Sequence, residues 1–115
     1  MATIKHTRNI KTNNTRAFIA AWENMHEGDT GEYLPFSQYA DKSVQVVGNM
    51  GGGSVVMEGS NDNGVTWAGL ADPQGNALSI SAPKLEQILE VAQLIRPRIV
   101  GGTGTDVSVY LLVKE

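Results

Sequence analysis

Hydrophobic and polar residues alternate along several short stretches of this chain, and this alternation predicts β-strands. Residues 17–22 are apolar on both faces, which favours a strand, although a short helix is the competing interpretation. Residues 94–100 alternate Ile95, Pro97 and Ile99 with two arginines, and the proline predicts an edge strand or a bulge. The clearest strand covers residues 107–114, whose inward positions would be Val107, Val109, Leu111 and Val113.

Glycine-rich segments separate the apolar runs and predict turns. Three consecutive glycines, 51–53, lie between the runs 44–48 and 55–57, which is the pattern of a β-hairpin. Residues 101–104, Gly-Gly-Thr-Gly, are expected to form the hairpin turn between the last two strands. Two further runs, 65–70 and 77–81, follow turn clusters. A spacing of about ten residues between strands is typical of a sandwich or barrel.

One stretch, residues 83–92, has helical rather than alternating periodicity. Its apolar residues recur at the spacing i, i+3, i+4 and i+7, and they are Leu85, Ile88, Leu89 and Ala92. Pro83 suits the first position of a helix. The pattern as a whole predicts an all-β fold, a compact antiparallel β-sandwich or barrel-like domain with one short helix and an extended N-terminal arm.

Composition supports this fold class. A chain of 115 residues has the size of one domain, and its 13 glycines, two phenylalanines and 18% charged residues fit a turn-rich β protein better than a helical bundle. The absence of cysteine excludes a disulfide framework, a thiolate zinc site and a cysteine nucleophile. No apolar run is long enough to predict a membrane-spanning helix.

Charge is distributed unevenly along the chain. The first 22 residues hold four basic and no acidic residues, whereas the remainder holds five basic and twelve acidic ones. We therefore divide the chain into a basic N-terminal arm, residues 1–16, and a single β-rich domain, residues 17–115. The arm would contact an acidic surface through Lys5, Arg8, Lys11 and Arg16, or it is a solvated terminus. Nucleic acid is not expected as a partner, because no aromatic residues interleave these charges and the protein is acidic overall.

The segment 60–67 reads Ser-Asn-Asp-Asn-Gly-Val-Thr-Trp and matches the Asp-box turn of sialidases and β-propellers. A single copy is too little for a propeller, so we expect a structural hairpin built by Ser60, Asp62, Gly64 and Trp67. A similar turn occurs in discoidin-like carbohydrate-binding domains, which favours sugar binding only weakly.

Candidate catalytic chemistry is sparse. The two histidines, His6 and His26, lie in no recognisable motif, and the glutamate of a calcium loop is absent after Asp62. We expect no enzyme activity, no metal and no cofactor. Arg96 and Arg98 share one strand face, where they would grip acidic residues of another copy in self-association or pair with acids of the same domain.

The order of several segments carries a resemblance to a known group of proteins. These segments are Ser-Val-Gln-Val-Val-Gly from residue 43, the Gly-Ser-Asn-Asp turn that ends in Trp67, and Leu-Ile-Arg-Pro-Arg followed by the glycine loop. In this order the chain resembles capsid decoration, or cement, proteins of tailed bacteriophages.

The resemblance implies a protein of the virion that binds the outside of the assembled head and stabilises the capsid. Its partner would be the major capsid protein, it would form a homo-oligomer with a trimer favoured, and it would need neither nucleic acid nor membrane. The basic arm resembles arms that lie across neighbouring capsid subunits.

Two alternatives remain at this point. The chain could be another virion part, a tail, connector or fibre subunit. It could also be a carbohydrate-binding module that uses exposed aromatic rings, for which Trp22, Tyr39 and Trp67 are the candidates.

Overall fold

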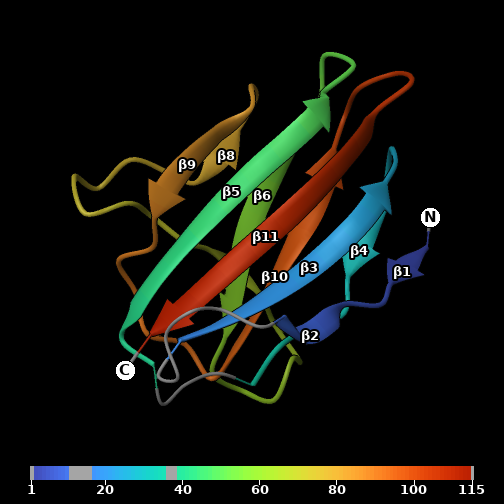
Figure 1. Cartoon of the computed structure of the whole chain (residues 1–115). Coiled ribbons are helices and arrows are strands. Elements are labelled where there is room, and N and C mark those ends of the chain that lie inside the picture. Colours follow the sequence, from blue (N-terminus) through green and yellow to red (C-terminus); the bar gives the residue numbers. More distant parts are fainter. Residues whose placement is uncertain (1, 11–16, 36–38, 115) are drawn as a thin grey trace.

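The computed structural model describes residues 2–10, 17–35 and 39–114, and they form two β-sheets packed face to face (Figure 1). Sheet A follows the order β1 (Thr3–Ile4), β4 (Thr30–Gly31), β10 (Leu94–Val100), β6 (Ser54–Ser60), β7 (Ala68–Gly69), with β8 (Ser79–Ile80) also paired to β6. Sheet B follows the order β2 (Thr7–Ile10), β3 (Ala17–Met25), β11 (Asp106–Lys114), β5 (Asp41–Asn49), β9 (Lys84–Gln87). Among the strands of these described residues, only β1 and β4 pair in parallel. The expected all-β sandwich is confirmed.

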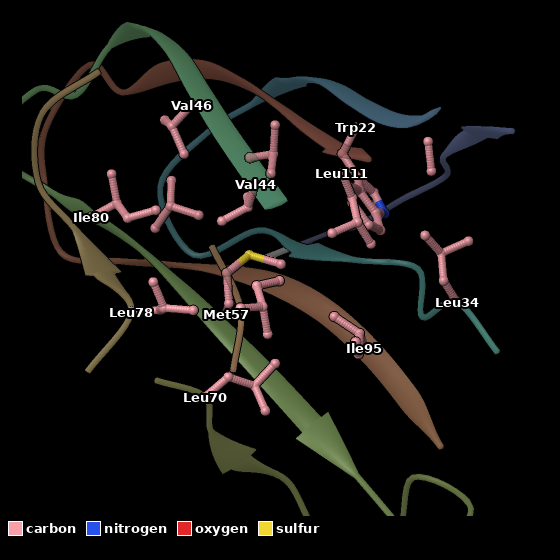
Figure 2. Close-up of a cluster of buried hydrophobic side chains, with 14 of the residues drawn as sticks. Trp22, Leu34, Val44, Val46, Met57, Leu70, Leu78, Ile80, Ile95 and Leu111 are labelled. Atoms are coloured by element: carbon pink, nitrogen blue, oxygen red, sulfur yellow. The ribbon is translucent and has the colours of Figure 1, made fainter. Parts of the chain in front are cut away.

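The core lies between the two sheets, where the inward residues of each strand meet. Strand β11 alternates as expected, with Val107, Val109, Leu111 and Val113 almost fully buried. Figure 2 shows Trp22, Val44 and Val46 of sheet B facing Met57 and Ile95 of sheet A. Two-residue periodicity in the sequence therefore corresponds to one buried face per strand.

Pro97 lies in an interior strand, so the expected edge position is wrong. The alternative, a bulge, is confirmed by a one-residue register shift around Pro97, between the pairs Leu34–Ile95 and Thr30–Arg98. Strand β10 has β6 on one side and β4 on the other. Ile95 bonds Leu34 through its N–H, at 3.1 Å, and Ile99 bonds the carbonyl of Asp29 at 2.9 Å. Pro97 lies midway between these donors, where its ring packs against Gly31. The proline is tolerated because the ladder is interrupted at the one position that lacks an N–H.

The helix expected at residues 83–92 is also wrong, and no helix occurs in the described residues. Residues 84–87 form the edge strand β9, paired antiparallel with β5. Ile88 and Ala92 are buried, but Leu85 is 63% exposed and Leu89 54% exposed. The apolar residues therefore do not share one face.

Both glycine-rich loops connect different sheets, so neither forms the expected hairpin. One leads from β5 in sheet B to β6 in sheet A, and the other from β10 in sheet A to β11 in sheet B. The loops lie side by side at one end of the sandwich (Figure 1), where Thr103 N donates to the carbonyl of Gly51 at 2.9 Å. The Thr105 hydroxyl donates to the carbonyl of Met50 at 2.9 Å. The two loops, 50–53 and 101–105, are therefore hydrogen-bonded to each other, and they are called the sheet crossings below.

The described part of the predicted arm is built into the domain. Strand β1 extends sheet A and β2 extends sheet B, so the segment 2–10 contributes to both sheets. Ala2 N donates to Asp29 Oδ1 at 3.1 Å, and His6 Nε2 lies 3.3 Å from Glu32 Oε1. Lys5 is exposed between the two strands. Arg8 belongs to β2, while Lys11 and Arg16, next to the proposed domain boundary, lie outside the described residues.

Candidate interaction surface

The outer face of sheet A carries two arginines that share one carboxylate. Alternation along β10 turns Arg96 and Arg98 outward, and Arg96 lies directly opposite Glu58 of β6. Arg96 Nε donates to Glu58 Oε1 at 3.1 Å, and Arg98 Nε donates to Glu58 Oε2 at 2.9 Å. The Glu58 side chain is only 9% exposed, whereas that of Arg98 is 42% exposed. The structure thus shows the intramolecular pairing that the sequence left open, and self-association through these arginines stays a prediction.

Two aromatic rings lie beside this ion pair. The Arg96 guanidinium carbon lies 3.9 Å from the centre of the Trp67 ring, which is a cation–π contact. The Tyr33 ring is centred 6.2 Å from that of Trp67 and is tilted by 37°. Tyr33 is 50% exposed and Trp67 is half-buried. Tyr33, Glu58, Trp67, Arg96 and Arg98 together are called the arginine–aromatic patch below.

The turn that joins β6 to β7 holds Trp67 in place. Asp62 Oδ1 accepts hydrogen bonds from the Ser60 hydroxyl at 2.7 Å and from Thr66 N at 3.0 Å. Ser60 Oγ in turn accepts from Gly64 N at 2.9 Å, and Gly64 has a φ of 84°. Trp67 Nε1 donates to the carbonyl of Gly64 at 3.1 Å. The four residues that the sequence singled out therefore bond within one turn.

Gln93 is a structural residue that the sequence did not reveal. Its backbone N–H donates to Asn61 Oδ1 at 2.8 Å, and its side-chain amide bonds Asn63 in both directions, at 2.5 and 2.9 Å. These bonds fasten the turn to the segment before β10. A contact 30 residues away in the chain has no local sequence signal.

The turn is expected to remain intact far into the acidic range. Hydrogen bonds from Thr66, first from its hydroxyl and then from its N–H, lower the pKa of Asp62 from 3.8 to about 2. A depressed pKa means that the ionised carboxylate stabilises the folded turn above pH 3.8, and that this stabilisation is lost as the pH falls through about 2.

This pH dependence can be followed by the NMR shift of the Thr66 amide proton. We expect one titration step near pH 2, and no such step in Asp62→Asn. A step near pH 4, the ordinary range of an aspartate, would contradict the hydrogen-bonded turn.

A shallow groove of about 470 Å³ lies next to the turn. It is lined by residues that include Asp62, Trp67, Gly69 and Glu90. Both carboxylates are engaged, Asp62 within the turn and Glu90 by Ala71 N at 2.8 Å. Of the rings expected as sugar-stacking platforms, Trp22 and Tyr39 are buried, which makes that expectation wrong for these two, and Arg96 lies over the ring of Trp67. Arg96 therefore covers one face of the Trp67 ring, the aromatic side chain that lines this groove.

Acidic side chains gather at the end of the sandwich where the sheet crossings lie. Glu27 Oε1 accepts a hydrogen bond from Thr105 N at 2.6 Å, and hydrogen bonds from backbone N–H groups, its own and that of Thr105, lower the pKa of Glu27. His26 lies between Asp29 and Asp106, with N···O distances of 3.9 and 4.0 Å. Glu23, Glu27 and Asp106, all exposed, are called the acidic end below.

Neither a metal centre nor a membrane-spanning helix is found in the described residues. No three of their His, Asp or Glu side chains are placed to hold a metal ion. Within the same residues, no helix is long and apolar enough to cross a membrane.

Comparison with known proteins identifies a shared fold. No family model matches the sequence, and no curated protein matches it either. Among solved structures, the SPBc2 prophage-derived protein YomS superposes with a TM-score of 0.65 at 15% identity, covering 91% of this chain and 100% of its own. A cupin domain from Bordetella pertussis Tohama I aligns at 14% identity over 100% of this chain and 99% of its own. Its TM-score of 0.34 does not indicate a common fold. The chain thus has the fold of a prophage-derived protein.

Proposed function

We propose that the protein is a non-enzymatic structural component of a tailed-phage virion, and that it binds the outside of the assembled head and stabilises the capsid. The observation that carries the proposal is the fold shared with a prophage-derived protein over 91% of this chain and all of that one. The sequence resemblance to decoration proteins supports the head, and the major capsid protein, as the binding site. On this proposal the protein is found on the exterior of the capsid.

The architecture suits such a role. Strands far apart in the sequence pair with each other in two sheets, and the sheet crossings at one end are hydrogen-bonded to each other. We expect such a domain to be rigid. A rigid domain loses little conformational entropy on binding. When many copies cover a shell, even a modest contact per copy adds up through multivalency. Stabilising a shell in this way requires no catalytic group.

The test is cosedimentation of the purified protein with expanded, DNA-free phage heads and, separately, with isolated tails. Saturable binding to heads with a fixed number of copies supports the proposal. Binding to tails or connectors instead would overturn it in favour of another virion part. Binding to neither, with a response on a glycan array, would overturn it in favour of a carbohydrate-binding module.

Neutralising the basic segment is expected to weaken head binding. The variant Lys5→Gln, Arg8→Gln, Lys11→Gln, Arg16→Gln should bind heads about five- to tenfold more weakly, because four charges that each contribute a few tenths of a kcal/mol to an ionic contact sum to about 1–1.5 kcal/mol. Substitution is preferable to deletion, since deleting residues 1–16 would also remove β1 and β2 from the two sheets.

The measurement is the affinity from cosedimentation at two salt concentrations. Lys84→Gln, Lys114→Gln is the control for a change of net charge elsewhere on the surface. Equal affinities of the arm variant and the wild type would show that the basic residues of the arm do not contact the shell.

A further inference from the structure

We propose that the arginine–aromatic patch is a self-association surface, and that it binds the acidic end of a second copy of this chain. The inference goes beyond the proposed head binding and does not depend on it. It rests on the unused hydrogen-bond donors of the patch, on its composition, and on the distribution of charge over the molecule.

The patch has donor groups that its internal contacts do not use. In the described part of the chain, each of the two guanidinium groups bonds protein atoms through Nε, to Glu58. The terminal nitrogens of Arg96 and Arg98 therefore keep their N–H groups for a further acceptor. Glu58 balances one of the two positive charges, so the patch retains a net charge of one. A carboxylate is the group that a guanidinium fork binds best.

The residue types of the patch, and the contacts that hold its side chains in one conformation, suit a protein interface. Tryptophan, tyrosine and arginine are the residues most often responsible for binding energy at interfaces. Here Arg96 is held between Glu58 and the ring of Trp67, and Trp67 is held by its bond to Gly64. Side chains fixed in this way lose little entropy when a partner binds. Tyr33 adds a half-exposed ring at the margin.

Charge complementarity indicates which surface of the second copy binds the arginine–aromatic patch. The acidic end presents Glu23, Glu27 and Asp106, and the segments that form it, 23–29 and 101–106, contain no lysine or arginine. Asp106 is 60% exposed at its side chain. A negative surface and a positive patch on different parts of one chain attract each other between copies. Because the two surfaces differ, the contact is either reciprocal across a two-fold axis or head-to-tail, and a head-to-tail contact closes into a ring or extends as a filament.

The experiment is sedimentation velocity of the full chain at low and high salt, about 0.03 M and about 0.5 M, which changes the screening length severalfold. We expect an oligomer at low salt that dissociates at high salt. Two variants, Arg98→Gln and the double variant Glu23→Lys, Asp106→Lys, should each raise the dissociation constant at least tenfold. Lys114→Gln, which removes an exposed charge outside both surfaces, should leave it unchanged.

Mixing the two variants makes the test specific. The intact patch of the Glu23→Lys, Asp106→Lys chain can bind the intact acidic end of the Arg98→Gln chain, so a heterodimer should form where each variant alone is monomeric. Circular dichroism of each variant establishes that it is folded.

Three results would overturn the inference: a monomeric wild type at low salt, an oligomer that neither variant weakens, or variants that fail to complement each other. A monomer that still sediments with heads would leave the proposed function standing. A salt-sensitive oligomer that binds no head would overturn the proposed function alone.

Discussion

Replacing Trp22 with alanine is expected to lower the free energy of unfolding by about 3–5 kcal/mol, as is usual for truncating a large buried aromatic residue. Trp22 is fully buried, and it projects from β3 into the core between the two sheets. Its Nε1 donates to the carbonyl of Glu32 at 2.9 Å, and the His6 ring packs edge-on against it at 5.9 Å. The substitution therefore leaves a cavity and a carbonyl without its donor.

Urea denaturation followed by circular dichroism measures this loss. Trp67→Ala is the matched control, because Trp67 is half-buried at the surface and its removal should cost only about 1–2 kcal/mol of stability. Trp22→Phe keeps most of the buried volume and should fall between the two. If Trp22→Ala and Trp67→Ala lowered the free energy of unfolding equally, the result would contradict the burial of Trp22 in the core.

The second large effect is expected at the glycine triplet between β5 and β6, where Gly51→Ala should destabilise the protein by about 2–5 kcal/mol. Gly51 has a φ of 60°, and Gly52 has a φ of 80°, so alanine at either position adopts a left-handed conformation that costs about 1–2 kcal/mol. A methyl group at Gly51 would also strike the carbonyl oxygen of Thr103 in the neighbouring crossing, and overpacking adds about 1–3 kcal/mol.

Gly52 provides an internal control for this effect. A methyl group at Gly52 meets no atom within 4 Å, so Gly52→Ala should show the backbone cost alone. The difference between the two midpoints of thermal or urea unfolding isolates the contact between the crossings. Equal midpoints would show that the two loops do not pack as described.

The fold class could be predicted from the sequence because alternation in a strand depends on neighbouring residues only. Val107 to Val113 alternate in the sequence and in their burial. The prediction of a helix at residues 83–92 is wrong because the helical spacing of its apolar residues is coincidental. Ile88 faces the core, whereas Leu85, on the edge strand β9, and Leu89, in the segment after it, face outward. Short apolar runs fit both periods, and only the packing decides between them.

The connectivity of the strands could not be predicted in the same way. The glycines in segments 51–53 and 101–104 indicate a change of direction, but they do not specify whether the next strand joins the same sheet or the opposite one. The choice depends on pairing between strands that are distant in the sequence. In sheet B, for example, β3 and β5 both pair with β11 and not with each other. The turn at Asp62 could be predicted because its bonds span four residues. The pairing of Glu58 with Arg96 spans 38 residues and has no local signature.

The position of β11 bears on how the protein is synthesised. It is the last strand in chain order, yet it lies in the middle of sheet B, paired with β3 on one side and β5 on the other. While the chain grows on the ribosome, both partners are translated long before the strand that joins them, and their edges stay open to other chains. The nascent protein therefore cannot complete sheet B until residue 114 has emerged from the ribosome.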